Sequence, residues 1–232
     1  MGKATKFEYR HRYVILPLIY ASTYILYGVD RINIVWALGH WNRAHTIQLD
    51  AQVFTFAAIV AEAGVVLWTW ARAYVPVGSD ETTLVEDGPY RYVRNPLYLS
   101  GLLLAIGFGF FQSRLGFVLL IPLELIFVYR LIAFEESELQ QRYGEAFLAY
   151  CRHVPRLLPT FSPWPSDATR EPRWRQAIAH DLYLWGYVVT LIAFAVTLND
   201  KVGHRFTATT LCVWLLQKAY RAAFGKRSRM TA

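Results

Sequence analysis

Cysteine, methionine and charged side chains are scarce in this chain of 232 residues, which has two cysteines, two methionines and 18% charged residues. Cys151 lies in a basic loop and Cys212 in an apolar segment, and their positions match neither metal-ligand nor redox spacing, so we expect no disulfide. Internal repeats, low-complexity tracts and a glycine-rich phosphate loop are also lacking. No small-residue cleavage site follows the basic N-terminal residues, and we therefore expect the first apolar run to be a retained membrane helix.

Apolar and aromatic residues are abundant instead. The chain is 55% hydrophobic, with eight Trp and fifteen Tyr, and its mean hydropathy is +0.23. This composition is typical of a membrane protein with aromatic residues at both interfaces. The net charge of +7 comes from basic residues that flank apolar segments. They form no single patch, so the predicted partner is the anionic surface of a lipid bilayer rather than nucleic acid.

The apolar segments predict an all-α fold, a polytopic membrane helix bundle with about six transmembrane helices. A further apolar stretch, Ile32–Trp41, is short for a crossing, and it either prolongs the first hairpin or lies in the interface. Polar residues interrupt three of the expected spans, including Glu62 in the second. The expected spans are Tyr13–Val29, Ala51–Ala71, Leu97–Phe111, Leu115–Phe134, Ile178–Leu198 and Phe206–Tyr220.

Lysine and arginine positions predict the orientation of this bundle. With the N-terminus inside, only five basic residues fall outside: Arg31, Arg43, Arg114, Lys201 and Arg205. The other Lys and Arg residues then face the cytoplasm, which is the bias that membrane proteins show. We therefore expect both termini in the cytoplasm and a single integral membrane domain over residues 1–232.

Two polar segments meet at the cytoplasmic side of this topology. Gly88–Leu99 holds two prolines, Pro89 and Pro96, which a long helix cannot cross unbroken. Taken alone, this segment is equally consistent with a site for a charged small molecule and with a basic interfacial loop rich in tyrosine. Glu135–Arg152 is polar with one apolar stripe at helical spacing, and we expect it to continue the fourth span. The hairpin between them brings both segments to the mouth of one bundle.

The carboxylates of the second segment are candidates for chemistry. Glu135 and Arg142 lie on nearly the same helix face, two turns apart, whereas Glu136 points elsewhere into the same region. We favour a functional role for Glu135 and Glu136, because placing a carboxylate at a membrane boundary without a partner costs free energy. For Glu138 we favour a structural role, as one partner of a solvated i,i+4 ion pair with Arg142. Glu62 is either a functional intramembrane acid or a partner for a neighbouring helix.

Residues 88–98, Gly-Pro-Tyr-Arg-Tyr-Val-Arg-Asn-Pro-Leu-Tyr, resemble the first signature of the isoprenylcysteine carboxyl methyltransferase and phospholipid methyltransferase superfamily. Its second signature is similar to Glu135-Glu136, Leu139, Tyr143-Gly144, Phe147, Tyr150 and Val154-Pro155-Arg156. The resemblance covers about residues 84–160, with one helical hairpin between the signatures. Asn95 stands where many members have histidine, and Phe147 where tyrosine is common. Asparagine does not titrate near neutral pH, so Asn95 suffices for orientation but not for moving a proton.

The resemblance implies an integral membrane methyltransferase that uses S-adenosylmethionine. An arginine would grip the donor's carboxylate, a glutamate its ammonium or ribose, and a tyrosine its adenine or sulfonium. Glu136 and Arg142 are the candidate catalytic residues, with Arg142 orienting a carboxylate substrate or Glu136 removing a proton from an amine or thiol. The candidate cofactor-binding residues are Tyr90, Arg91, Arg94, Asn95, Pro96, Tyr98, Glu135 and Glu136.

The predicted acceptor is a membrane lipid or another hydrophobic small molecule, with a carboxyl, amine or thiol group. One alternative is an NADPH-dependent membrane reductase with the helical layout of steroid reductases. The other is a lipid-binding relative that has lost turnover, which only Asn95 favours. We expect no metal and no nucleic acid. His180 and Asp181 are expected to make interfacial hydrogen bonds, and the predicted location is the inner or plasma membrane in a bacterium.

Overall fold

The computed structural model describes residues 2–41, 46–75, 84–165 and 170–224. Within these ranges the chain is helical, and its only bridge of strand type is an isolated one between Asn33 and Ser113. This confirms the predicted all-α class. In chain order, the helices are α1 (Lys6–Arg10), α2 (Arg12–Ile25), η1 (Leu26–Gly28), α3 (Ile34–Trp41), α4 (Ile47–Tyr74), η2 (Gly88–Arg91), α5 (Pro96–Gly109), α6 (Arg114–Tyr143), α7 (Glu145–His153), α8 (Trp174–His180), α9 (Leu182–Thr197) and α10 (Asp200–Phe224).

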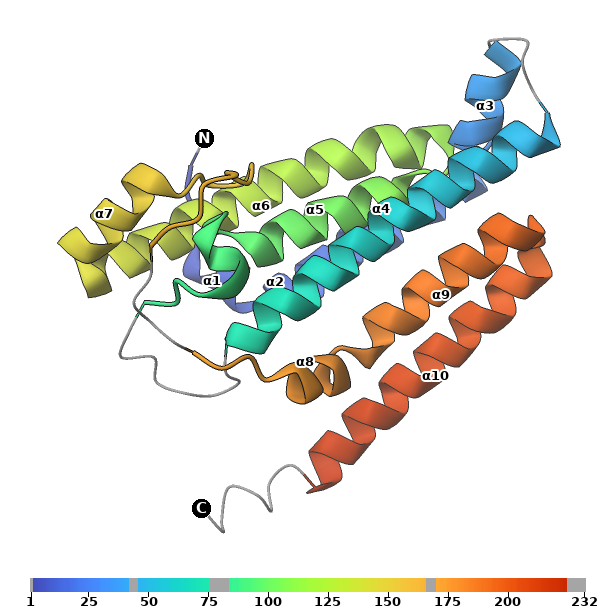
Figure 1. Ribbon diagram of the computed structural model, residues 1–232. Coiled ribbons are helices and arrows are strands. Elements are labelled where there is room, and N and C mark those ends of the chain that lie inside the picture. Colours follow the sequence, from blue (N-terminus) through green and yellow to red (C-terminus); the bar gives the residue numbers. More distant parts are fainter. Residues whose placement is uncertain (1, 42–45, 76–83, 166–169, 225–232) are drawn as a thin grey trace.

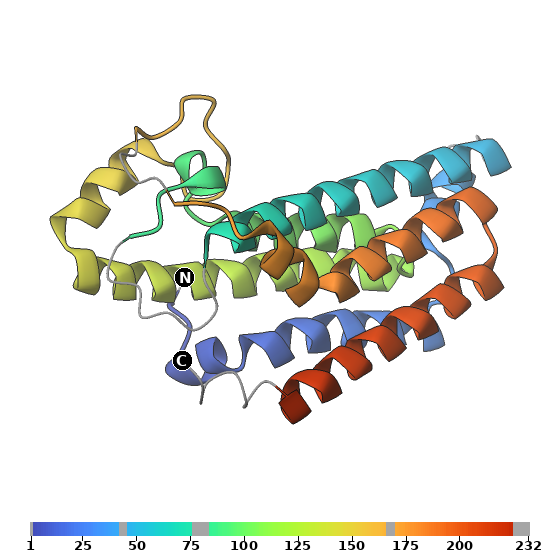
Figure 2. The same ribbon diagram turned by 60° about the horizontal axis from the view of Figure 1, so that its bottom comes forward.

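Helices α4, α5 and α6 form the centre of the bundle. Figure 1 shows α4, α5 and α6 side by side along the long axis, with α9 lying along α4 and α10 running back beside α9. Figure 2 shows α2 on the other side, and α2 packs against α6. Helices α1, η2 and α7 all gather at one end, to which α6 projects.

Small residues allow α4 and α5 to approach closely. A Cβ on Gly107 would lie 2.6 Å from the carbonyl oxygen of Ala57, and one on Gly64 would lie 2.9 Å from that of Ser100. Such contacts are typical of membrane helices, where van der Waals packing of backbones drives association. The close pair holds the start of α5, where the first polar segment ends, in a fixed position beside α4.

The second polar segment contains a break that the sequence interpretation did not include. Helix α6 continues without interruption from the expected fourth span to Tyr143, which confirms the first part of the predicted extension. Gly144 then adopts a φ of +54°, a conformation that glycine takes at little cost. The following helix, α7, turns away from the axis of α6 (Figure 1). The expected single helix Glu135–Arg152 is therefore two helices.

By length and composition, two helices, α4 and α6, can cross a membrane, and the bent pair α8 and α9 counts as a third span if taken together. The predicted number of about six is thus not confirmed. Helices α2 and α5 have 14 residues each, and α2 contains Pro17. The expected span Ile178–Leu198 bends by 66° between α8 and α9, where the Asp181 carboxylate accepts a hydrogen bond from Nε1 of Trp68.

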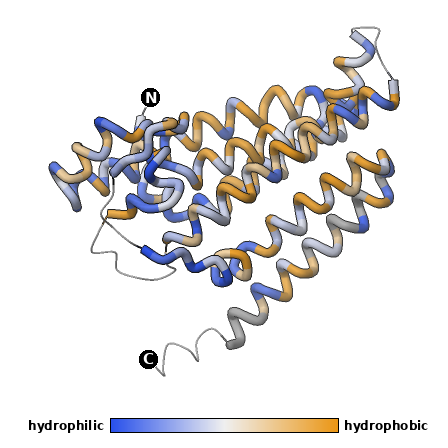
Figure 3. Tube along the Cα trace, in the orientation of Figure 1, coloured by the Kyte–Doolittle hydropathy of each residue, from blue (hydrophilic) through white to orange (hydrophobic). Residues whose placement is uncertain are grey.

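Hydrophilic residues concentrate where α1, η2 and α7 gather, which we call the polar end (Figure 3). At the opposite end, Nη2 of Arg114 lies 2.9 Å from Oδ1 of Asp30, and the amide of Leu115 donates to Oδ2 of Asp30 at 3.0 Å. The Arg114 guanidinium lowers the pKa of Asp30. This pair joins the turn before α3 to the start of α6.

Candidate active site

The turn η2 is fixed at both of its ends by residues with restricted geometry. Gly88 adopts a φ of +59°, and a Cβ there would clash with the ring of Tyr74. Only glycine meets both conditions. Pro96 is the first residue of α5 and Asn95 is its N-cap. Proline suits this position because the amide it lacks would have no partner within the helix. The side chains between these residues are thereby aimed into the polar end.

The segment that follows α7 holds the turn from outside. The amide of Arg94 donates to the carbonyl of Pro155 at 2.9 Å. Nε of Arg91 donates to the carbonyl of Trp164 at 2.8 Å, and the Trp164 amide donates back to the Arg91 carbonyl at 2.9 Å. Nε1 of Trp164 donates to Glu86 at 2.6 Å. Through these bonds, Arg91 holds the loop after α7 in place against η2.

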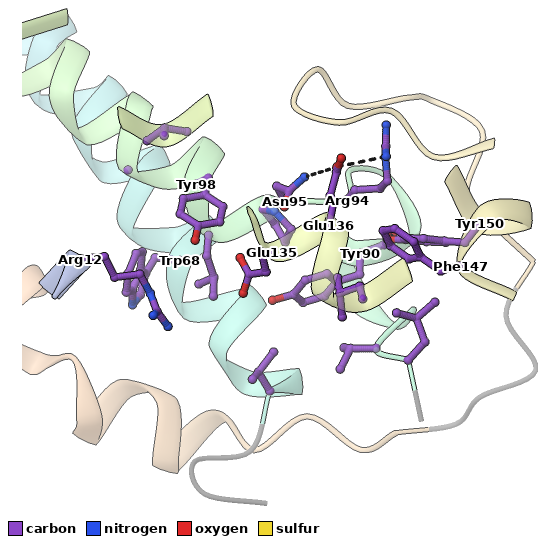
Figure 4. A pocket seen from close by; sticks show the side chains of 18 of the residues that line it. Arg12, Trp68, Tyr90, Arg94, Asn95, Tyr98, Glu135, Glu136, Phe147 and Tyr150 are labelled. Carbon is purple, nitrogen blue, oxygen red and sulfur yellow. Dashed lines mark hydrogen bonds and ion pairs between the residues drawn. The ribbon is translucent and has the colours of Figure 1, made fainter. Parts of the chain in front are cut away.

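Glu136 is the centre of the polar contacts in this region. Its side chain is buried, and donors from three residues contact its two oxygens. Nη1 of Arg94 lies 3.1 Å from Oε1, and Nη2 of Arg156 lies 2.6 Å from Oε2. Nδ2 of Asn95 donates to Oε1 at 3.2 Å (Figure 4). Two guanidinium groups face one carboxylate, so the cluster keeps a net positive charge that suits an anionic ligand group.

Asn95 connects the members of this cluster without carrying charge. Besides its bond to Glu136, Nδ2 donates to the carbonyl of Arg156 at 3.1 Å. One amide group therefore holds the carboxylate of α6 and the loop after α7 together. This is an orienting role, which an asparagine fulfils as a fixed donor.

Arg94 has unused donor capacity. Its Nη1 also contacts Sγ of Cys151 at 3.0 Å, and burial raises the pKa of the Cys151 thiol. A protonated thiol takes little of the guanidinium charge. Nε of Arg94 is buried and has no hydrogen-bond partner among the described residues. A buried donor of this kind is costly to leave unsatisfied, and a bound anion would satisfy it.

Glu135 lies on the other side of α6 and has aromatic neighbours. The hydroxyl of Tyr9 donates to Oε1 of Glu135 at 3.1 Å, and the ring of Tyr98 lies near this carboxylate (Figure 4). Burial and the Glu135 charge raise the pKa of Tyr9, so its hydroxyl remains a donor at neutral pH. The guanidinium of Arg12 lies 4.1 Å from the centre of the Tyr9 ring. The carboxylate is thus oriented by the Tyr9 phenol and not neutralised by a direct salt bridge among the described residues.

A cavity of about 220 Å³ connects these groups. Its walls come from α2, α4, η2, α5, α6 and α7, and they are mostly apolar. Val75 and Leu84 line it as well, and the residues between them lie outside the described ranges, so the volume refers to the described walls. A mostly apolar cavity with a few convergent polar groups is the usual form of a small-molecule site.

Helix α7 closes one side of the cavity. Phe147 and Tyr150 are buried and line it. The hydroxyl of Tyr150 donates to the carbonyl of Tyr90 at 2.6 Å, and burial raises the pKa of Tyr150, which keeps this donor protonated. The bend at Gly144 makes this contact between α7 and η2 possible.

A family model described as phospholipid methyltransferase matches residues 50–146, from α4 to the start of α7. Over these residues the chain is similar to the phospholipid methyltransferase family. The match includes η2, Asn95, Glu135 and Glu136, and it supports the resemblance of the first signature and of the second signature up to residue 146. The superfamily prediction is confirmed for this region.

Two curated relatives of this chain have names that refer to metals. The cobalt-zinc-cadmium resistance protein CzcN of Cupriavidus metallidurans is 25% identical over 174 residues, which are 72% of this chain and 80% of the relative. The nickel-cobalt-cadmium resistance protein NccN of Alcaligenes xylosoxydans xylosoxydans is 28% identical over 100 residues, or 43% of this chain and 46% of the relative. No solved structure matches the chain.

Most of the candidate residues from the family signatures meet in the cavity. Arg91 and Arg142 are the exceptions. Arg91 binds the loop carbonyl of Trp164, and Arg142 is exposed on α6 and does not line the cavity. An offset of two helix turns from Glu135 carries Arg142 beyond the mouth. The residues that line the cavity are Tyr90, Arg94, Asn95, Pro96, Tyr98, Glu135 and Glu136.

Four polar residues near the methyltransferase signatures had no assigned role in the sequence interpretation. Arg156 lies in the second signature, but its pairing with Glu136 depends on the bend at Gly144. Arg12 and Tyr9 come from outside the matched region, so no family motif marks them. Glu124 lines the inner part of the cavity. The sequence could have indicated Glu124 because it is an acidic residue within an expected apolar span. Glu62 was singled out for this same reason.

The other polar residues singled out from the sequence lie away from this cavity. Glu62 is exposed on α4 and does not line it. Asp181 binds Trp68 and lies 3.4 Å from Nε of Arg72, and Nδ1 of His180 lies 2.7 Å from Oδ1 of Asp181. The hydrogen-bonding role expected of His180 and Asp181 is therefore confirmed.

Proposed function

We propose that this chain is an S-adenosylmethionine-dependent methyltransferase that acts on a lipidic or hydrophobic acceptor. The observation that carries the proposal is the cluster around Glu136. It keeps a net positive charge and an unused Arg94 donor beside a cavity lined by Glu135, within the methyltransferase family region. Members of this family generally use S-adenosylmethionine.

The chemistry of the cavity fits the parts of this donor. Arg94 would hold its carboxylate, because a guanidinium group binds a carboxylate through charge-assisted hydrogen bonds, and Arg156 would keep Glu136 in place beside it. Glu135 would accept hydrogen bonds from its ammonium or its ribose hydroxyls. The rings of Tyr90 and Tyr98 offer faces for the adenine or the cationic sulfur. When bound, the donor supplies a methyl group on a positively charged sulfur.

The chain's contribution to catalysis is positioning and exclusion of water. Glu136 and Asn95 hold Arg94 in place, and α7 covers the cavity, so reacting groups would meet in one orientation. Positioning of this kind contributes up to roughly 7–11 kcal/mol to a displacement reaction. Arg142 does not line the cavity, so it would contact only an acceptor that lies outside the described cavity.

The acceptor would reach the cavity from the lipid. The protein would be one integral membrane domain over residues 1–232, with several crossings and the polar end in the cytoplasm, where the donor is dissolved. The two relatives are named as metal resistance proteins. By analogy, the methylation of a membrane component by this chain would contribute to metal resistance.

Binding and turnover are tested separately. Isothermal titration of the purified protein in lipid nanodiscs should detect S-adenosylmethionine and its product S-adenosylhomocysteine, with NADPH as the comparison ligand. Methyl-labelled donor is then incubated with total membrane lipid, and labelled products are identified by mass spectrometry. Absence of donor binding by folded protein overturns the proposal, and preference for NADPH supports a reductase. Donor binding without any labelled product supports a non-catalytic relative.

A further inference from the structure

The segment before α2 packs on the part of α6 that carries Glu135. The family model begins at residue 50, so this segment, residues 4–11, lies outside the matched region. Its helix, α1, has five residues, and a helix this short is not stable by itself in water. Contacts with the rest of the protein therefore fix its position, and several of them are made with α6.

Arg130 of α6 anchors this segment. Nη2 of Arg130 donates to both carboxylate oxygens of Glu8 at 2.8 Å, and the carbonyl of Arg130 accepts a hydrogen bond from the amide of Ala4 at 3.0 Å. Ala4 is buried in a cluster with apolar residues of α6. Glu8 also accepts from the amide of Thr5 at 2.6 Å, which closes the first turn of α1. An ion pair, a backbone bond and apolar burial thus hold α1 against α6.

Tyr9 connects the anchored segment to the donor site. The centre of its ring lies 4.7 Å from that of Phe134, and the guanidinium of Arg12 lies 4.1 Å from the same ring centre. Nη1 of Arg12 also donates to the Tyr9 carbonyl at 2.8 Å. Because the ring is held by two neighbours, its hydroxyl has a fixed place, from which it donates to Oε1 of Glu135 at 3.1 Å.

The anchor and the donor site are separate along α6. Glu135 lines the cavity (Figure 4), whereas Tyr9 and Arg130 do not. Five residues separate Arg130 from Glu135, which is about 8 Å along the helix axis. Tyr9 therefore links the position of α1 to a carboxylate of the donor site without reaching the ligand itself.

A fixed donor matters for a glutamate because its side chain has several rotamers. Ordering such a side chain at the moment a ligand binds costs free energy, which lowers the affinity. The bond from Tyr9 orders the Glu135 carboxylate before any ligand arrives. The hydroxyl is well suited to this, since it gives a directed hydrogen bond without neutralising the carboxylate charge.

We propose that the N-terminal segment is a functional part of the donor site and that Tyr9 is a positioning residue that orients Glu135 for S-adenosylmethionine. The inference rests on the proposed methyltransferase function, in which Glu135 accepts hydrogen bonds from the ammonium or the ribose of the donor. Docking of α1 through Arg130 and donor binding at Glu135 are then coupled, because both depend on where Tyr9 lies. Such coupling is reciprocal, so the bound donor also stabilises the docked segment.

Two variants, each with a matched control, test this coupling in the full-length protein in lipid nanodiscs. Tyr9→Phe removes one hydroxyl and keeps the ring, and its control Tyr129→Phe removes an exposed hydroxyl from α6. Arg130→Gln removes the anchor. Its control Arg10→Gln removes an exposed charge from α1, for which no ion pair is found among the described residues. The double variant of Tyr9→Phe and Arg130→Gln completes a double-mutant cycle.

Titration calorimetry with S-adenosylhomocysteine measures the affinity of the donor site. We expect Tyr9→Phe to weaken binding about fivefold, the effect of ordering one carboxylate side chain on binding. Arg130→Gln should weaken binding about threefold in the wild-type background and by less than about 1.5-fold in Tyr9→Phe, because the anchor acts through the hydroxyl. Both controls should match the wild type.

Two further measurements separate positioning from a purely structural role. In turnover of methyl-labelled donor with total membrane lipid, Tyr9→Phe should raise the KM for S-adenosylmethionine about fivefold and leave kcat within about twofold, as for a contact made equally in the ground and transition states. In hydrogen–deuterium exchange, S-adenosylhomocysteine should slow the exchange of amides in residues 4–13 of the wild type, and not in Tyr9→Phe.

Unchanged donor affinity in Tyr9→Phe, or additive effects of Tyr9→Phe and Arg130→Gln, overturns the inference and leaves the methyltransferase proposal intact. A fall in kcat without a change in KM does the same, because it would assign Tyr9 to folding alone. Failure of the folded wild type to bind S-adenosylhomocysteine overturns the proposed function instead.

Discussion

Glu136 and Glu124 lie on the same helix, twelve positions apart, and both are buried, yet their surroundings are opposite. Glu136 is held by Arg94, Arg156 and Asn95. Glu124 has a buried oxygen with no partner among the described residues. The first carboxylate stabilises the mouth of the cavity before any ligand arrives. The second has no such contacts. The cavity thus has one end with paired charges and one end with an unpaired carboxylate oxygen.

Removing the Glu136 charge should have the largest effect on both stability and binding. Glu136→Gln leaves two guanidinium groups without their anion, one of them mostly buried. We expect a loss of about 3 kcal/mol of unfolding free energy, at the low end for a broken buried pair because Arg156 is partly exposed. Donor-dependent methylation should fall by at least about 100-fold, since Arg94 loses its position. Denaturant titration and turnover of methyl-labelled donor measure the two effects.

Glu138→Gln is the matched control, because Glu138 is exposed two positions further along α6. It should change stability by less than about 0.5 kcal/mol and leave turnover unchanged. If both variants behave alike, the Glu136 cluster does not organise the site.

Two arginines, Arg142 on α6 and Arg156 after α7, should differ in their effect on donor binding. Arg156→Ala removes a 2.6 Å contact to Glu136 and one cation from the cluster. We expect S-adenosylhomocysteine to bind about tenfold more weakly, as for the loss of one charge-assisted hydrogen bond. Arg142→Ala changes an exposed side chain outside the cavity, so affinity should stay within about twofold. Titration calorimetry compares them, and the reverse order would return Arg142 to the site.

The inner carboxylate should respond to removal in the opposite direction from Glu136. Glu124→Leu replaces an unpaired buried group by an apolar one of similar size, so we expect stability to increase by about 1–3 kcal/mol. Thermal unfolding in nanodiscs, followed by tryptophan fluorescence, measures the change. A loss of stability would show that Glu124 has a partner in the folded chain.

The sequence predicted the elements of the site better than their connections. The tyrosines, Arg94 and the glutamates were identified because their motif has a fixed order along the chain. Arg156 was assigned no role because its contact with Glu136 depends on the positive φ of Gly144, and a polar segment with an unbroken apolar stripe gives no sign of that bend. The bend within one expected span was missed for a related reason. Apolar composition identified Ile178–Leu198, but the break at Asp181 depends on its contacts with Trp68 and Arg72 of α4.

Asn95→His, which restores the residue common in the family, should have the smallest effect. Nδ2 of Asn95 donates to both Glu136 and the Arg156 carbonyl, whereas a neutral imidazole has one N–H and can satisfy only one of them. The lost bond is worth about 1 kcal/mol, so donor affinity should fall by no more than about fivefold. Titration with S-adenosylhomocysteine measures this. An increase in turnover of tenfold or more would instead mean that a titrating group is useful at this position. In that case the mouth of the cavity moves a proton as well as holding the donor, and the division between its two ends would no longer stand.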